Sequence, residues 1–138
     1  MCQVYQSTPT KNTIMKILIC EDEEIMLTAL EFRLRKQGFM VEKAEDGQQA
    51  LDKLKSVKYD LIIADIMMPY ISGLELIQFI RKDLKDTDTP IIIISALEYE
   101  DVLLKAFRLG ASDFISKPFK PNELILRIKR IFQEKGNI

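Results

Sequence analysis

Acidic, hydroxyl and ammonium groups stand where several apolar stretches of this chain end. Glu21 and Asp22 follow the run KILIC, and Asp65 follows LIIA. Ser95 closes the run PIIIIS, and Lys117 comes directly after DFIS. Clustered carboxylates repel one another, and a hard divalent cation such as Mg²⁺, which prefers oxygen ligands, relieves that repulsion. A carboxylate beside such a cation, a lysine and a hydroxyl group can attack phosphorus, so the chemistry of this set is phosphoryl transfer.

These side chains meet only if the intervening elements bring the ends of the apolar stretches together. Five apolar stretches alternate with five stretches of helical periodicity. The predicted strands are residues 16–20, 39–44, 61–64, 90–95 and 113–116, and the predicted helices are residues 23–37, 48–57, 74–82, 98–109 and 121–134. This alternation favours a parallel sheet covered on both faces, in a doubly wound α/β domain. The site of such a domain lies at the carboxyl ends of its strands, although periodicity alone leaves the strand order open.

The composition is that of one globular domain, with 138 residues, 47% of them hydrophobic and 30% charged. The net charge of -1 gives no basic excess for nucleic acid, and the chain has no nucleic-acid-binding motif. The absence of histidine excludes imidazole catalysis, and with only two cysteines it argues against zinc and against a disulfide framework. No apolar run reaches the ~18 residues of a membrane span, so we expect a cytoplasmic protein.

The chain divides into a short leader and one domain. Residues 1–14 are polar and lack periodicity, whereas MKILICEDEE, which begins at Met15, looks like the natural start of a domain. We therefore expect residues 1–14 to form a loosely ordered extension and residues 15–138 to form the folded domain.

Four motifs carry a family resemblance. CEDEE, LIIADIMMPYISG, IIIISA and DFISKPF, in this order and spacing, resemble the receiver domain of bacterial response regulators over residues 15 to about 134. The resemblance implies a flavodoxin-like (βα)5 three-layer sandwich with strand order 2-1-3-4-5. It also implies a phosphoprotein of two-component signal transduction, which takes a phosphoryl group from a sensor histidine kinase onto Asp65. Such a switch is not an enzyme for external substrates, since it catalyses only its own phosphorylation and dephosphorylation.

The resemblance also implies a magnesium site around this aspartate. Asp22 matches the direct ligand, and Glu21 occupies the partner acid position, where the acid binds directly or through a water. Asp65 itself and the backbone carbonyl of Met67 complete the implied protein ligands.

The implied switch residues lie near the ends of the last two predicted strands. Ser95 matches the hydroxyl that swings toward the phosphoryl group, and Lys117 matches the lysine that contacts it. Phe114 occupies the switch aromatic position, often tyrosine, and so lacks a hydroxyl group. The peptide bond before Pro118 is commonly cis in this family.

Two variable positions flank the implied site. Met67 and Leu97 stand two residues after Asp65 and Ser95, where family members tune hydrolysis of the acyl phosphate. Both side chains are apolar and offer no hydrogen bond to an attacking water. We therefore expect slow self-dephosphorylation, which a half-life of seconds would contradict.

The last third of the chain resembles receivers of winged-helix transcription factors, which pair through their fourth helix, fifth strand and fifth helix. The matching interface positions are Leu103, Phe107, Asp113, Glu123, Ile125, Arg127 and Lys129. Two departures leave the charge pairing incomplete. Leu103 replaces a basic partner for Glu123, and Arg108 replaces an acidic partner for Lys129. Leu103 and Phe107 could instead form an apolar contact in a homodimer.

Several alternatives stay open from the sequence. The receiver could act alone on a downstream effector protein, belong to a longer transcription factor with an output domain, or serve as a scaffold without phosphorylation. A phosphohydrolase would carry a second acid two residues after Asp65, where Met67 stands. A flavodoxin-type electron carrier is disfavoured because EDEE after the first predicted strand would repel a phosphate.

Overall fold

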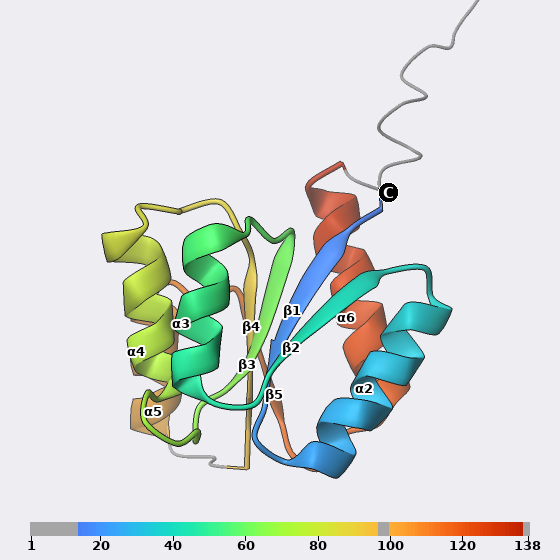
Figure 1. Cartoon of the computed structure of the whole chain (residues 1–138), viewed down its shortest axis with the longest axis horizontal. Coiled ribbons are helices and arrows are strands. Elements are labelled where there is room, and N and C mark those ends of the chain that lie inside the picture. The colour runs from blue at the N-terminus through green and yellow to red at the C-terminus, as the bar shows by residue number, and fades with distance from the viewer. Residues whose placement is uncertain (1–13, 97–99, 137–138) are drawn as a thin grey trace, which may run out of the picture.

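Five parallel strands form the centre of the molecule, in the order β2-β1-β3-β4-β5 (Figure 1). The computed structural model describes residues 14–96 and 100–136. The strands are β1 (Lys16–Cys20), β2 (Met40–Ala44), β3 (Leu61–Asp65), β4 (Ile91–Ser95) and β5 (Asp113–Ser116). The predicted parallel sheet and the strand order implied by the resemblance are confirmed.

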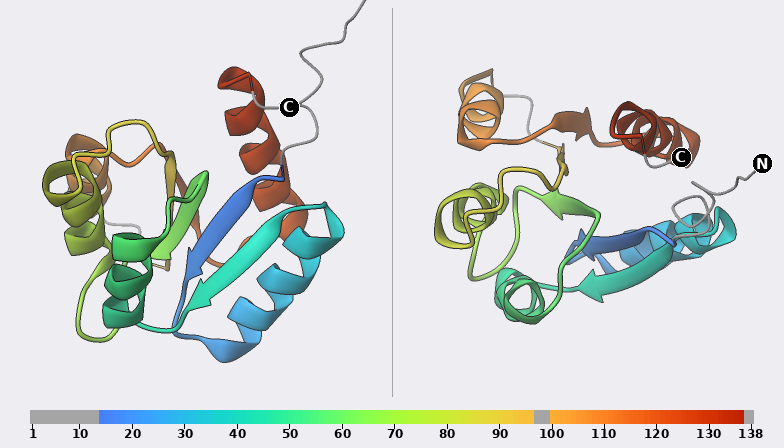
Figure 2. Two further views of the ribbon diagram at one scale, coloured as in Figure 1. Left: turned by 45° about the horizontal axis from the view of Figure 1, so that its top comes forward. Right: turned by 90° about the horizontal axis from the view of Figure 1, so that it is seen from above.

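Helices cover both faces of the sheet, as Figures 1 and 2 show. The helices are α2 (Glu24–Lys36), α3 (Gly47–Ser56), α4 (Gly73–Gln78), α5 (Glu100–Leu109) and α6 (Pro121–Glu134). Helices α2 and α6 lie on one face, and α3, α4 and α5 lie on the other, which confirms the three-layer sandwich. Among the described helices, none combines the length and the apolar character needed to cross a membrane.

Alternate residues of each inner strand belong to two separate cores. Ile17 and Ile63 pack in the cluster that includes Phe132 of α6, whereas Leu18 and Ile62 pack in the cluster with α3, α4 and α5. All five side chains are almost fully buried. Each contributes roughly 1.5–3 kcal/mol relative to an exposed position, so the two cores fix the register and hence the place where each strand ends.

The predicted helix over residues 74–82 differs from the observed one. Helix α4 ends at Gln78 and continues as a π-helical turn, η1 (Phe79–Asp83), which the Leu84 N–H closes by donating to the Phe79 carbonyl at 3.0 Å. The guanidinium of Arg81 donates to the carbonyls of Gly110 and Asp86. These hydrogen bonds accompany the π-helical turn. Because they reach residues outside the helix, the hydrophobic periodicity of residues 74–82 could not predict them.

Two other predicted segments fall partly outside the described residues. The expected loosely ordered extension, residues 1–14, is described only at Ile14, which is exposed. The predicted helix from residue 98 is described from Glu100 onward.

Candidate functional site

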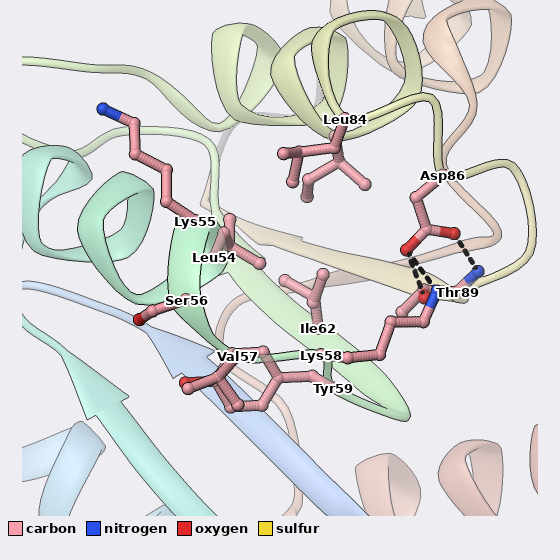
Figure 3. A pocket seen from close by; sticks show the side chains of 11 residues that line it. Leu54, Lys55, Ser56, Val57, Lys58, Tyr59, Ile62, Leu84, Asp86 and Thr89 are labelled. Carbon is pink, nitrogen blue, oxygen red and sulfur yellow. Dashed lines mark hydrogen bonds and ion pairs between the residues drawn. The ribbon is translucent and has the colours of Figure 1, made fainter.

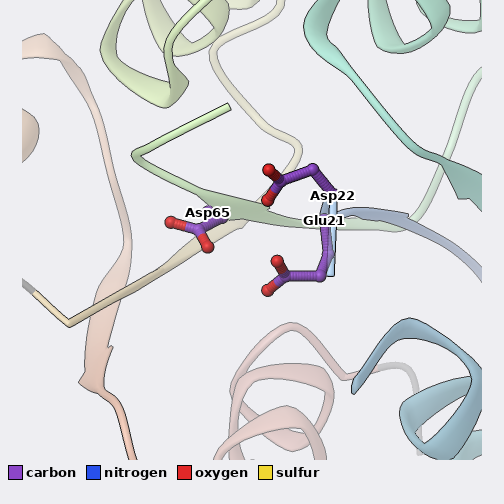
Figure 4. A group of neighbouring side chains, drawn as sticks. All are labelled: Glu21, Asp22 and Asp65. Atoms are coloured by element: carbon purple, nitrogen blue, oxygen red, sulfur yellow. The ribbon is translucent and has the colours of Figure 1, made fainter. Parts of the chain in front are cut away.

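Three carboxylates meet at the carboxyl ends of β1 and β3. Glu21 and Asp22 directly follow β1, and Asp65 is the last residue of β3. One oxygen from each lies within 4.8 Å of the others (Figure 4). Glu21 and Asp65 are buried, while Asp22 is exposed. The spacing of these acids predicted their convergence, and the structure confirms it.

Lys117 links two of the three carboxylates. Its Nζ lies 2.6 Å from Asp65 Oδ2 and 2.9 Å from Glu21 Oε1. Burial alone would lower the pKa of Lys117, but the hydrogen bond to Asp65 and the negative charges of Asp65 and Glu21 outweigh burial and raise that pKa. The backbone N–H of Lys117 also donates to the Ser95 carbonyl at 2.8 Å, and this bond holds the residue after β5 against the end of β4. The Lys117–Pro118 peptide bond is cis, as the resemblance implied.

Glu21 is a carboxylate whose hydrogen-bonding capacity is only partly used. Its Oε2 accepts a hydrogen bond from the Glu23 backbone N–H at 3.0 Å. Its Oε1 is the single buried side-chain nitrogen or oxygen atom without a hydrogen bond in residues 14–96 and 100–136, despite the nearby Lys117 ammonium. Burial is the largest cause of the raised pKa of Glu21, and the Asp65 charge also raises it. A buried acceptor beside two further carboxylates suits a hard cation, so the residues fit Mg²⁺.

The segment after Asp65 leaves the site open on one side. The Met67 backbone N–H donates to Asp65 Oδ1 at 2.9 Å, while the Met67 side chain is exposed. The Ile66 N–H donates to the Ile94 carbonyl, which holds the start of this segment against β4. A hollow of about 430 Å³ lies beside it, lined by Asp22, Ile66, Met67, Met68, Pro69 and Ser72.

The predicted switch residues Ser95 and Phe114 lie on the neighbouring strands β4 and β5. Ser95 is fully buried at the end of β4, and Phe114 on β5 is partly buried against the core shared by α3, α4 and α5. Their register places Ser95 opposite Ser116, two residues beyond Phe114. Their switching roles stay predictions. Leu97 lies outside the described residues.

Three of the charged residues assigned to a dimer interface, Asp113, Glu123 and Arg127, pair within the chain. Arg127 Nη1 lies 2.8 Å from Asp113 Oδ1, and its Nη2 lies 3.2 Å from Glu123 Oε2. Arg130 lies 3.3 Å from the other oxygen of Asp113. Lys129, the other charged residue assigned to the interface, is exposed on α6.

The apolar residues assigned to the same interface differ in exposure. Phe107 is 43% exposed and Leu103 is partly buried, whereas Ile125 is only 6% exposed and belongs to the core. Leu104, which we did not single out from the sequence, is 47% exposed on the same helix as Phe107.

A second hollow lies away from the three carboxylates (Figure 3). It has a volume of about 290 Å³, and its walls come from the end of α3, the start of β3 and the loop before β4. Asp86 in its wall accepts hydrogen bonds from Thr89 and Lys58, so this acid is paired locally.

Sequence reasoning missed two residues that shape the site, Glu23 and Gly47, and it placed Gly73 only at the end of the turn that follows Asp65. Glu23 places its carboxylate 3.9 Å from Lys117 Nζ, and its position within CEDEE was the available signal. Gly47 and Gly73 contact the backbone of the segment between β3 and α4. The only signal for each glycine was its place directly before a predicted helix.

The family of this chain follows from comparison with known proteins. The family model described as "Response regulator receiver domain" matches residues 17–129. The chain belongs to this family, which confirms the resemblance of its four motifs. Receivers of this kind are signalling switches that bind Mg²⁺ in an acidic pocket, take phosphoryl groups from histidine kinases and regulate output domains.

Two curated relatives are regulators about twice as long as the matched region. The alkaline phosphatase synthesis transcriptional regulatory protein PhoP of Bacillus subtilis (strain 168) is 36% identical over 118 residues, which are 86% of this chain and 48% of PhoP. The response regulator ArlR of Staphylococcus aureus (strain USA300) is 42% identical over 120 residues, 87% of this chain and 53% of ArlR. The chain thus spans about half the length of the curated relatives it matches.

Solved receiver structures share the fold over nearly their whole length. The receiver domain of the Francisella response regulator 1452 superposes with a TM-score of 0.81 at 30% identity, covering 88% of this chain and 98% of that one. TrrA of Thermotoga maritima, solved in complex with Mg²⁺-BeF, has a TM-score of 0.76 at 36% identity, covering 85% and 98%.

Proposed function

We propose that Asp65 accepts a phosphoryl group and that Glu21, Asp22 and the Met67 carbonyl help to hold the Mg²⁺ that the reaction needs. The observation that carries the proposal is the buried cluster in which Lys117 lies between Asp65 and Glu21, with Asp22 beside them. The structure of TrrA in complex with Mg²⁺-BeF supports the proposal, because it is a related response regulator solved with this cation.

The chain's own residues divide the work of the transfer. An oxygen of Asp65 attacks phosphorus, an acyl phosphate forms, and the bond from phosphorus to the donor nitrogen of a kinase histidine breaks. The Lys117 ammonium, already 2.6 Å from Asp65, then balances the charge of a phosphoryl oxygen, and the Ser95 hydroxyl donates to another. When bound, Mg²⁺ would supply further positive charge. The chain thereby catalyses only its own phosphorylation and dephosphorylation.

Intact mass spectrometry tests this proposal directly. The protein is incubated with Mg²⁺ and a small-molecule phosphodonor, beside Asp65→Asn and beside a sample with the metal chelated. We expect the mass of one phosphoryl group on the wild type with Mg²⁺ only. No added mass, also with a histidine kinase as donor, would favour a scaffold that works without phosphorylation.

We further propose that phosphorylation promotes pairing of two copies through α5, β5 and α6, and that this receiver serves the control of transcription, as the name of PhoP suggests. Leu104 and Phe107 form an exposed apolar pair at i, i+3 on α5. Because Arg127 is paired within the chain, apolar contact would supply most of the association. Sedimentation velocity with and without beryllofluoride should show a dimer that Phe107→Asp prevents, and a persistent monomer would contradict pairing.

A further inference from the structure

The segment between β3 and α4, residues 66–72, is anchored at both ends by its backbone. At the start, the Ile66 N–H donates to the Ile94 carbonyl at 3.1 Å. At the end, the Gly73 N–H donates to the Ile66 carbonyl at 2.9 Å, and a Cβ on Gly73 would lie 2.6 Å from the Asp65 carbonyl oxygen. Because both ends are held, a displacement of any residue between Ile66 and Gly73 must shift the other residues between them, including Met67.

The middle of this segment is a strained γ-turn. The Ile71 N–H donates to the Pro69 carbonyl at 2.9 Å, and Tyr70 between them has a φ of 72°. A non-glycine residue in this region costs roughly 1–3 kcal/mol and persists only where surrounding contacts impose it. The Tyr70 side chain is 83% exposed, so its ring does not hold the turn.

Gly47, the first residue of α3, is the contact that holds the turn from outside. Its N–H donates to the Pro69 carbonyl at 3.3 Å, and a Cβ at this position would lie 2.4 Å from Ile71 Cβ and 2.5 Å from the Ile71 carbonyl oxygen. The φ of Gly47 is not in the left-handed region, and alanine is favoured over glycine by about 1 kcal/mol in helices. The neighbouring turn, rather than the conformation of Gly47 itself, therefore requires glycine here.

We propose that Gly47 is a positioning residue for phosphoryl transfer. By letting α3 approach Pro69 and Ile71, it imposes the γ-turn and fixes the backbone of Met67 beside Asp65. The inference rests on the proposed function, because Met67 matters only if its backbone helps to hold Mg²⁺ next to the phosphoacceptor. A side chain at position 47 would push Ile71 and move the segment between its two anchors.

Gly47→Ala is the direct test, with Mg²⁺ affinity of the unphosphorylated protein as the first readout. Isothermal titration calorimetry at pH 7 should show that Mg²⁺ binds about tenfold more weakly or worse, as is common when residues behind metal ligands are changed. Phosphoryl addition from a small-molecule donor should fall at low Mg²⁺ and recover in part as Mg²⁺ is raised. Amide hydrogen exchange at Ile71, whose N–H closes the turn, should become faster.

Two further variants separate positioning from folding. Gly38→Ala is the matched control, because Gly38 has a φ of +93° and no atom near its Cβ position, so it should lose stability without weakening Mg²⁺ binding. Gly47→Ala combined with Ile71→Gly removes the 2.4 Å contact but leaves the 2.5 Å approach to the carbonyl oxygen of residue 71, so it should recover only part of the Mg²⁺ affinity lost in Gly47→Ala. If Gly47→Ala does not fold, the double variant is compared with Ile71→Gly, and weaker Mg²⁺ binding in the double variant supports the proposal.

Two results would overturn the inference. The first is wild-type Mg²⁺ affinity in folded Gly47→Ala, whether or not its stability has changed, because that would leave only a structural role. The second is equal Mg²⁺ affinity in the double variant and Ile71→Gly. In both cases a wild type that binds Mg²⁺ and gains a phosphoryl group shows that the proposed function stands. A wild type that does neither overturns the proposed function, and the inference with it.

Discussion

Two carboxylates at opposite ends of the sheet have opposite environments. Asp86, at the amino end of β4, accepts hydrogen bonds from two backbone N–H groups, the Thr89 hydroxyl and the Lys58 ammonium. Burial would raise the pKa of Asp86, but these bonds, led by those from Thr89, hold it well below its ordinary value. Glu21, at the carboxyl end of β1, has a raised pKa because of burial, and its Oε1 lacks a hydrogen bond.

The comparison indicates that Asp86 stabilises the fold, whereas Glu21 and Asp65 are placed to bind a ligand. The negative charge of Asp86 is stabilised by three hydrogen bonds from its own loop and by the ammonium of Lys58, which among the described residues pairs with this acid alone. Glu21 and Asp65 each accept one backbone hydrogen bond, and they share the single ammonium of Lys117. Only the carboxyl end of the sheet should therefore respond strongly to cations and to phosphoryl groups.

The largest effect should come from Lys117→Met, which removes the shared ammonium. We expect phosphoryl addition at saturating Mg²⁺ to slow by about 10²-fold, the usual cost of losing one group that stabilises transition-state charge. Without Mg²⁺ the variant should also unfold at lower urea concentration, because two buried carboxylates lose their cation. Added Mg²⁺ should restore part of that stability.

Lys129→Met provides the matched control, because Lys129 is exposed on α6. It should leave both the rate and the urea midpoint close to those of the wild type. A time course of intact mass measures the rate. Equal rates for Lys117→Met and the wild type would contradict the claim that the Lys117 ammonium at the carboxyl end of the sheet assists phosphoryl transfer.

The positions of the site residues were predictable because an apolar run fixes where a strand ends. Glu21, Asp65 and Ser95 each end or follow such a run, and parallel strands bring those ends to one edge. The two-sided core then leaves little freedom in register, so the layers and the convergence of the acids followed from the same pattern.

Features that depend on contacts between distant elements were not predictable in this way. The π-helical turn of η1 accompanies bonds from Arg81 to Gly110, 29 residues away. The requirement for glycine at position 47 comes from Ile71 on another segment. The internal pairing of Arg127 with Asp113 likewise depends on how α6 lies on β5, whereas the sequence shows only their charges.

A smaller effect, on stability alone, is expected at the amino end of the sheet. Asp86→Asn should lower the free energy of unfolding by about 2 kcal/mol at pH 7, because an amide cannot accept all four hydrogen bonds of the charged carboxylate. Asp83→Asn on the neighbouring turn is the control, since Asp83 is exposed. Calorimetry should show unchanged Mg²⁺ binding in both variants. A weakened Mg²⁺ affinity in Asp86→Asn would show that the two ends are coupled.

The smallest and most specific effect should be the pH dependence of that stability difference. Asp86 has a lower pKa in the folded protein than its ordinary value of 3.8, so its stabilising contribution is complete above about pH 4 to 5. As the pH falls through that value toward the folded pKa, the unfolded chain binds the proton first and the contribution is lost.

Urea unfolding of the wild type and Asp86→Asn at pH 7, 5, 4 and 3 measures this effect. The difference between their free energies of unfolding should be constant down to pH 5 and should shrink below pH 4. Glu21, whose pKa is raised, changes stability in the opposite direction, but it is present in both proteins and cancels from the difference. A difference that stayed constant to pH 3 would mean that hydrogen bonds to an ionised Asp86 are not what distinguishes it from Glu21.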